Sequence, residues 1–241
     1  MALPSITEPE IGAFIAALLR CGALAMTAPV IGDGGVPARA KVILATAVAI
    51  AVAANRPGVA FAELPEVAFV ELAAGLVTGL TASFVLARVA VGGQLIGLAL
   101  GLGFAQEFDA NAGESAGVTR TLASTLAGLA FLGAHGLEAI VRGVLVPAGG
   151  VMLGSGSEAL VAAAVSAFGH GLALAAPIVL AALVAHVGLA VMNRAAPAMN
   201  VFSISLGAVL AIGTSILLAT SGTFVLDIAE SARQAAQSIA G

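Results

Sequence analysis

The chain has 241 residues, of which 60% are hydrophobic and only 9% are charged. An ordinary soluble domain carries about 25% charged residues, so this composition excludes a protein that faces water over its whole exterior. It favours a membrane, a large protein assembly, or both as the surroundings of the chain. The formal net charge of −4 and the absence of any basic run argue against nucleic acid as a partner.

The N-terminal segment is expected to be retained rather than cleaved. It opens with two acidic residues, Glu8 and Glu10, where a secretory signal peptide has a basic region. Cys21 is the only cysteine, which rules out an intrachain disulfide and a cysteine-based zinc site. We expect Cys21 to be a small packing residue in a helix.

The sequence predicts an all-α fold, because apolar residues nowhere alternate with polar ones as they do in β-hairpins. Glycine- and proline-rich stretches such as "GDGGVP" and "NRPG" mark turns between the helices. Ser157 is expected to cap the start of the fifth helix. The expected helices are 9–31, 37–55, 64–106, 118–146, 158–193 and 200–239.

The lengths of the uncharged runs indicate how the helices are surrounded. Several runs have 14 to 18 residues, at or below the roughly 17 to 25 that a membrane span uses. With the absence of Trp and Tyr, this predicts helices buried against other helices more than against lipid. The run 159–193 is too long for one span, so Gly169 and Gly171 are expected to mark where its membrane helix starts.

Glycines recur every fourth residue at Gly93, Gly97 and Gly101, and again at Gly75 and Gly79. Residues four apart share one face of a helix, and glycine lets another backbone approach closely there. Spacing alone favours tight packing within one subunit. The alternative is a close contact between subunits beside a pore.

No motif in the sequence predicts catalysis, a metal or a cofactor. "GLGFAQ" lacks the last small residue of a dinucleotide fingerprint, and "GSGS" is not a nucleophile elbow. His135, His170 and His186 do not stand at metal-ligand spacing with any carboxylate. We therefore expect a protein that is not an enzyme.

The most apolar part of the chain contains a single arginine, Arg194, between two uncharged runs. Arginine suits the last turn of a helix, and proline suits the first turn of the next. Asn193, Arg194 and Pro197 therefore predict a corner at which one long helix ends and another begins.

This corner, "NRAAPAMNVFSIS", resembles the motif that joins the last two helices in the family of the flagellar export protein FliR and its type III secretion counterpart SctT. Two further stretches are similar to the same family and occur in the same order. The matching positions are Arg20, Ala28, Pro29, Pro37, Arg39 and Lys41 in the first stretch, Gly93, Ile96, Gly97, Gly101, Phe104, Ala105 and Asp109 in the second, and Asn193, Arg194, Pro197 and Asn200 at the corner.

The chain departs from the family pattern in several places. Ala99 stands where the family often has Gln, and Ala110 follows Asp109 in place of Pro. In "FLGAHGL" the Asn and the His of the family motif are not in place. "SISLGA" after the corner is nearer the secretion-system form, whereas the earlier stretches are nearer the flagellar form. The choice between a flagellar and a virulence-type system stays open.

The resemblance implies a multi-helix membrane-associated protein with a FliP-like region over 1–150 and a FliQ-like helical hairpin over 151–241. It implies a subunit of the export gate in the bacterial inner membrane, which uses no cofactor and lines a pore for unfolded proteins. The implied partners are FliP-like and FliQ-like subunits (SctR and SctS in secretion systems) and a protein like FlhB or SctU. The alternative function is a stand-alone polytopic permease.

The resemblance also implies roles for individual residues. A plug that seals the closed pore is expected between 100 and 117, with Leu100, Gly103, Phe104, Gln106, Phe108 and Asp109 as pore or plug residues. Helix packing or subunit contact is expected at Gly93, Gly97, Gly101, Asn193, Arg194, Pro197 and Asn200.

Overall fold

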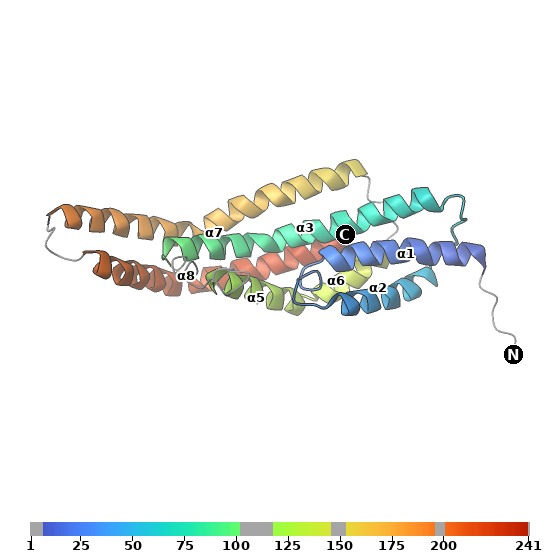
Figure 1. The fold of residues 1–241 in the computed structure, drawn as a ribbon, viewed down its shortest axis with the longest axis horizontal. Helices are drawn as coiled ribbons and strands as arrows, with labels where there is room; N and C mark the ends of the chain where they lie inside the picture. The colour runs from blue at the N-terminus through green and yellow to red at the C-terminus, as the bar shows by residue number, and fades with distance from the viewer. Residues whose placement is uncertain (1–6, 102–117, 146–152, 196–200, 241) are drawn as a thin grey trace. The chain divides into compact units, whose positions relative to one another are not determined.

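A computed structural model describes residues 7–101, 118–145, 153–195 and 201–240, the side chains of 118, 153–156, 201–206 and 239–240 excepted. The described residues contain α-helices and no strand, which confirms the all-α prediction. The helices are α1 (Glu8–Thr27), α2 (Ala38–Ala53), α3 (Leu64–Ala99), α5 (Val118–Gly133), α6 (Gly136–Leu145), α7 (Leu153–Ala195) and α8 (Val201–Ala240) (Figure 1).

Within the described ranges, four helices are long and apolar enough to cross a membrane. They are α1, α3, the Ser157–Ala195 part of α7 and the Gly207–Ser238 part of α8, and the bent pair α5 and α6 could form a fifth span. A hydrocarbon core of ~30 Å needs about 20 residues of helix, and each of the four meets that length. The chain is therefore a multi-pass membrane protein.

The chain divides into two compact units, each made of segments far apart in sequence. The first unit contains Met1–Val85, Phe131–Ala164 and Arg233–Gly241, and the second contains Leu86–Ala130 and Val165–Ala232. The expected division into a FliP-like region over 1–150 and a FliQ-like hairpin over 151–241 concerns similarity to other proteins, not compact units. It stays a prediction.

In the first unit, α1 packs against α2, α3 and α6, and α1 and α2 lie side by side in Figure 1. The glycines of the first half of α3 allow this approach. A Cβ at Gly75 would lie 2.6 Å from the Arg20 carbonyl oxygen, and one at Gly79 would meet Thr27. The pair at 75 and 79 is thus a surface for α1 within the same chain.

The first helix is shorter than the sequence indicated. It ends at Thr27 rather than at 31, because Ala28 has an extended backbone (ψ 144°). Proline disfavours helical geometry in the residue before it, and Pro29 follows Ala28. The Lys41 ammonium then donates to the Gly32 carbonyl over 2.8 Å and holds the turn between α1 and α2.

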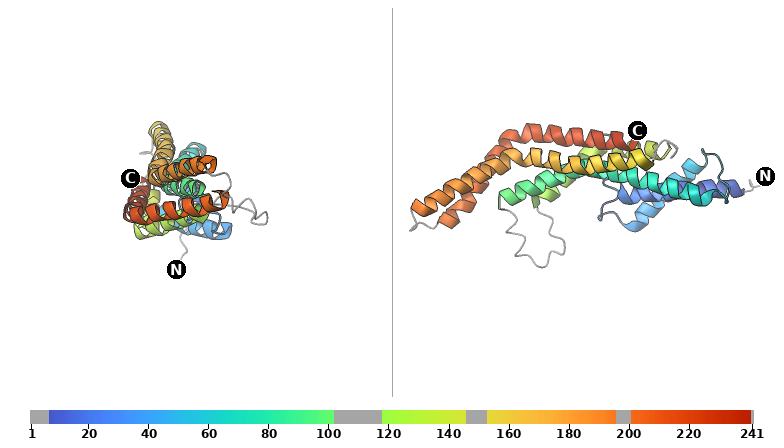
Figure 2. Two further views of the ribbon diagram at one scale, coloured as in Figure 1. Left: turned by 90° about the vertical axis from the view of Figure 1, so that its left-hand side faces the viewer. Right: turned by 90° about the horizontal axis from the view of Figure 1, so that it is seen from above.

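In the second unit, α3 packs against α5 and α7, and α8 completes two apolar clusters. Val89, Ala123, Ala127 and Ile228 form one cluster, and Ile96, Leu100, Ala175 and Ile178 form the other. Figure 2 shows α7 and α8 running alongside each other. These clusters fix the C-terminal half of α3 among its neighbours.

Two predicted helices are interrupted before their expected ends, and in each case a residue with positive φ lies two positions after the last helical residue. The helix expected over 64–106 ends at Ala99, and Gly101 has a φ of 73°. The helix expected over 118–146 breaks between α5 and α6, where His135 has a φ of 61°. At this break the Phe131 ring lies directly against Gly136 and leaves no room for a Cβ there.

The prediction that Gly169 and Gly171 mark the start of a helix is wrong. Helix α7 begins at Leu153 and continues through both glycines and through Pro177. Gly171 instead serves packing, since a Cβ there would lie 2.9 Å from the Arg88 carbonyl oxygen of α3. A close approach between helices and a helix start both favour glycine, so the sequence does not separate them.

Candidate functional site

The glycine face of the second unit lies against α5. A Cβ at Gly93 would lie 2.6 Å from the Ala123 Cβ and 2.9 Å from the Thr119 carbonyl oxygen. A Cβ at Gly97 would overlap the Thr119 hydroxyl. Both glycines are therefore occupied by packing within one chain, the arrangement that their spacing alone favoured.

Gly101 does not share this face, because α3 ends two residues before it. The Gly101 N–H donates to the Leu98 carbonyl over 3.1 Å in the closing turn of the helix. With its positive φ, Gly101 terminates α3 in the conformation that glycine adopts most readily. The expectation that three glycines share one helix face is correct for two of them.

Leu100 is buried at the same helix end, with only 2% of its surface exposed. Its side chain lies against Gly213 of α8, and it belongs to the cluster with Ile96, Ala175 and Ile178. Leu100 thus anchors the end of α3 in the core of the second unit.

These contacts bring together the two helices, α3 and α5, that flank the segment 102–117 in the sequence. Gly97, close to the last turn of α3, contacts Thr119, which is the second residue of α5. The predicted plug residues Gly103, Phe104, Gln106, Phe108 and Asp109 lie outside the described residues. The structure therefore describes the helices on either side of this segment, α3 before it and α5 after it.

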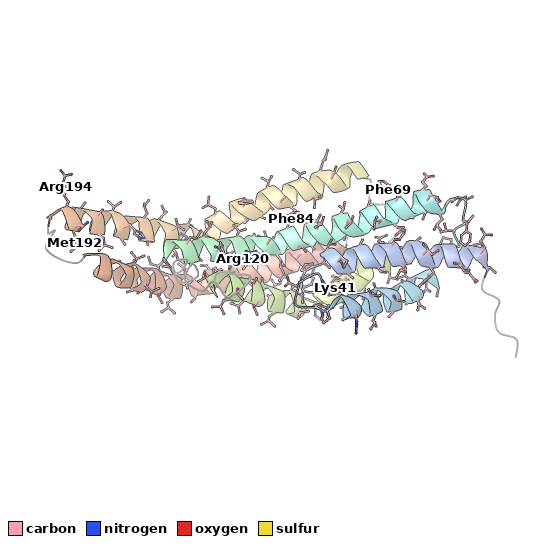
Figure 3. All side chains as sticks on the ribbon, viewed as in Figure 1. Lys41, Phe69, Phe84, Arg120, Met192 and Arg194 are labelled. Atoms are coloured by element: carbon pink, nitrogen blue, oxygen red, sulfur yellow. The ribbon has the colours of Figure 1, made fainter. Side chains whose placement is uncertain are left out.

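The structure describes the helix that leads into the predicted corner, up to Ala195. Arg194 lies in the last turn of α7, as expected from the macrodipole and from the free carbonyls of a helix end. Asn193 and Arg194 are both exposed, and Figure 3 shows Arg194 at the end of α7, pointing away from the helices. Pro197 and Asn200 lie outside the described residues, and α8 begins at Val201.

A buried ion cluster holds the first unit together. The Glu71 carboxylate lies 2.8 Å from Arg56 Nη1 and 3.4 Å from Arg20 Nη1. Arg20 Nη2 donates to the Gly143 carbonyl and Arg56 Nη2 to the Val144 carbonyl, each over 2.8 Å. The last carbonyls of a helix lack partners within it, so the two arginines cap the C-terminal end of α6.

Sequence reasoning missed this cluster. It singled out Arg20 as part of a motif and placed Arg56 only within the turn "NRPG", and it assigned no role to Glu71. The available signal was that charges inside span-length apolar helices are costly unless they pair with one another. That signal indicates that partners exist, but not which residues they are.

Many large apolar side chains on the described parts of α7 and α8 are exposed, since no other described residue covers them fully. Most of those on α7 recur at intervals of three or four residues, which is the spacing of one helix face. The exposed apolar residues of α7 are Val161, Val165, Phe168, Leu172, Leu180, Leu183, Val184, Val187, Val191 and Met192. Those of α8 are Leu210, Ile212, Leu218, Val225 and Leu226.

Comparison with known proteins identifies the family. The family of bacterial export proteins, family 1, matches residues 11–235, almost the whole chain. The chain belongs to this family. Its relatives include the flagellar biosynthetic protein FliR of Escherichia coli, 31% identical over 84% of this chain and 81% of the relative.

Two further FliR proteins are similar. The FliR of Pectobacterium carotovorum is 30% identical over 81% of this chain and 78% of its own length. The FliR of Aquifex aeolicus is 34% identical over 66% of this chain and 63% of its own length. The resemblance to the FliR family is thereby confirmed. The chain is a component of a flagellar or type III export apparatus and a multi-pass protein of the inner membrane.

Proposed function

We propose that the chain forms part of the pore wall of the export gate and that residues 100–117 form the plug of the closed pore. Family membership over residues 11–235 carries this proposal. The helices that flank the segment support the proposal, because Gly93 and Gly97 on α3 pack directly against Thr119 and Ala123 on α5. Because α3 and α5 are in direct contact, displacement of the segment between them would not separate these two helices.

The composition of the segment suits a seal that opens. Phe104 and Phe108 are four residues apart and can fill a lumen, whereas Glu107, Asp109 and Glu114 favour water once the segment has moved. Leu100 stays buried in the second unit and would act as the fixed end of the plug.

The partners we propose are FliP-like and FliQ-like subunits, with a protein like FlhB or SctU associating with them. The exposed apolar faces of α7 and α8 support partners of this kind, because helices of other subunits can pack against such faces. The proposed substrates are unfolded proteins, which cross a pore without the specific midplane site that a permease requires.

The decisive experiment shortens the plug by deleting part of 106–114 in cells that also produce the partner subunits. Uptake of a small solute is measured, and assembly is checked by co-purification of the partners. We expect an assembled complex and a leaky membrane, because the packing of Gly93 and Gly97 does not involve the deleted residues.

The matched control is the same deletion in cells without the FliP-like subunit, where no gate assembles and no leak is expected. Equal uptake by intact and shortened chains, with assembly demonstrated, would show that the segment is not the seal. A leak that persists without the partner subunit would instead favour the stand-alone permease.

A further inference from the structure

The first unit contains an open pocket of about 340 Å³, lined by charged and small apolar side chains, at the start of α6 and beside the C-terminal part of α8. None of its lining residues belongs to the glycine face. Its lining residues are Ala134, His135, Glu138, Ala139, Arg142, Arg233, Ala236 and Gln237.

The charges around this pocket do not balance. The Glu138 carboxylate pairs with Arg142 over 2.6 Å, and His135 Nδ1 lies 3.7 Å from the same carboxylate. Arg233 has no ion-pair partner among the residues that the structure describes. The lining therefore carries one carboxylate and two guanidinium groups, and a second anion would complete it.

An apolar strip runs beside the pocket on the same helix. Leu137, Val141 and Leu145 follow one another at intervals of four residues, and 44% to 50% of the surface of each is exposed. Glu138 and Arg142 occupy the next positions along the chain, so the apolar strip and the polar pair lie on neighbouring faces of α6. The face opposite the strip is buried through Gly136, Ala139 and Gly143.

We propose that this pocket binds the phosphate of an anionic phospholipid, with Arg233 and Arg142 as its cationic groups and with an acyl chain lying along Leu137, Val141 and Leu145. The ligand of this site is an amphiphile rather than a simple anion, because a cationic pocket and an exposed apolar strip lie next to each other. Arginine forms charge-assisted bonds with phosphate oxygens, and basic pockets on membrane helices bind lipid headgroups in this way.

The proposal does not depend on the function of the plug. A carboxylate from a neighbouring subunit would satisfy Arg233 equally well, but it would leave the apolar strip without a partner. We therefore commit to the lipid, and the neighbouring subunit is an outcome of the test.

The experiment uses the full chain in native membranes supplemented with photoactivatable phosphatidylglycerol at subsaturating concentration. The yield of lipid cross-linked to the peptide that contains 132–145 is measured against the yield on the exposed face of α7. Phosphatidylcholine with the same acyl chains is the matched probe. We expect the phosphatidylglycerol label on 132–145 to exceed the phosphatidylcholine label there, and the two lipids to label α7 equally.

Three variants complete the test. Arg233→Gln should lower the phosphatidylglycerol yield at 132–145 roughly tenfold, as expected for one lost bond to a charged group. Glu138→Gln should raise the yield, because it removes the anion that competes with the lipid, and misfolding would not produce a gain. Arg39→Gln removes an exposed charge elsewhere in the first unit and should change nothing.

Four outcomes would overturn the proposal. They are equal labelling by the two lipids, equal yields from Arg233→Gln and Arg39→Gln, displacement of the lipid by millimolar inorganic phosphate, and no gain from Glu138→Gln. Labelling of 132–145 that appears only when the partner subunits are absent would assign Arg233 to a subunit contact instead.

Discussion

Helix α1 and the helices α7 and α8 are all apolar enough to cross a membrane, yet the chain itself covers them very differently. Within the span-length windows, 50% of the residues of α1 are buried, against 17% in α7 and 11% in α8. Mean hydropathy is 1.5 for α1 and 1.9 for α8, a small difference beside the more than fourfold difference in buried share, so composition does not explain the contrast. Helix α1 has its neighbours inside the chain, whereas α7 and α8 leave most of their surface to lipid or to other subunits.

The glycines show the same contrast. In α3, Gly75 and Gly79 lie directly against α1, and Gly93 and Gly97 lie directly against α5. In α7 and α8, a Cβ at Gly188 or Gly222 would meet no atom within 4 Å. The four glycines of α3 therefore serve contacts inside the chain, whereas Gly188 and Gly222 have open space beside them among the described residues.

The largest effect should follow removal of the anion at the centre of the first unit. Glu71→Ala removes the carboxylate that Arg20 and Arg56 share and leaves the buried Arg20 guanidinium without its ion-pair partner, which typically costs about 3–5 kcal/mol. We expect a large fall in the midpoint of thermal unfolding in detergent and early proteolysis in the region of α1. Glu66→Ala, an exposed position on the same helix, is the control. Equal stability of the two variants would mean that the cluster does not hold the unit.

The glycine face should give the next largest effect. Gly97→Leu places a side chain where the Thr119 hydroxyl already lies, and overpacking costs about 1–3 kcal/mol. Export or motility should fall while the protein stays in the membrane, which immunodetection in membrane fractions checks. Gly188→Leu is the matched control for stability, since its site is open. Full export by Gly97→Leu would contradict the packing of α3 against α5.

The outward glycines distinguish subunit contact from lipid contact. Gly188→Leu and Gly222→Leu should leave the stability of the chain nearly unchanged, because no atom of a described residue lies within 4 Å of a Cβ at either position. If partner subunits cover these faces, both variants should lower co-purification of the FliP-like and FliQ-like subunits. Normal assembly of both would show that these two positions face lipid.

The smallest effect should come from the turn between α1 and α2. Lys41→Met removes one hydrogen bond to the Gly32 carbonyl and should cost about 1 kcal/mol. A shift of a few degrees in thermal unfolding, with export intact, is the expected result. A loss of export at unchanged stability would assign Lys41 a role beyond the turn.

The sequence by itself determined the all-α class, the membrane location, the family and the helix end at Arg194. Each of these depends on composition or on spacing along one helix, and such features are local. The spacing of Gly93 and Gly97 likewise predicted a close helix contact at these positions. It did not predict that the contacting helix is α5.

Only the tertiary structure decided which residues meet. Arg20 and Glu71 are 51 positions apart, and Arg56 reaches a carbonyl 88 positions away, so no periodicity could pair them. The break at His135 depends on the Phe131 ring lying against Gly136, and the continuation of α7 through Gly171 depends on contact with α3. Glycine suits a turn, a helix end and a close contact alike, and only the neighbouring side chains determine which of these it serves.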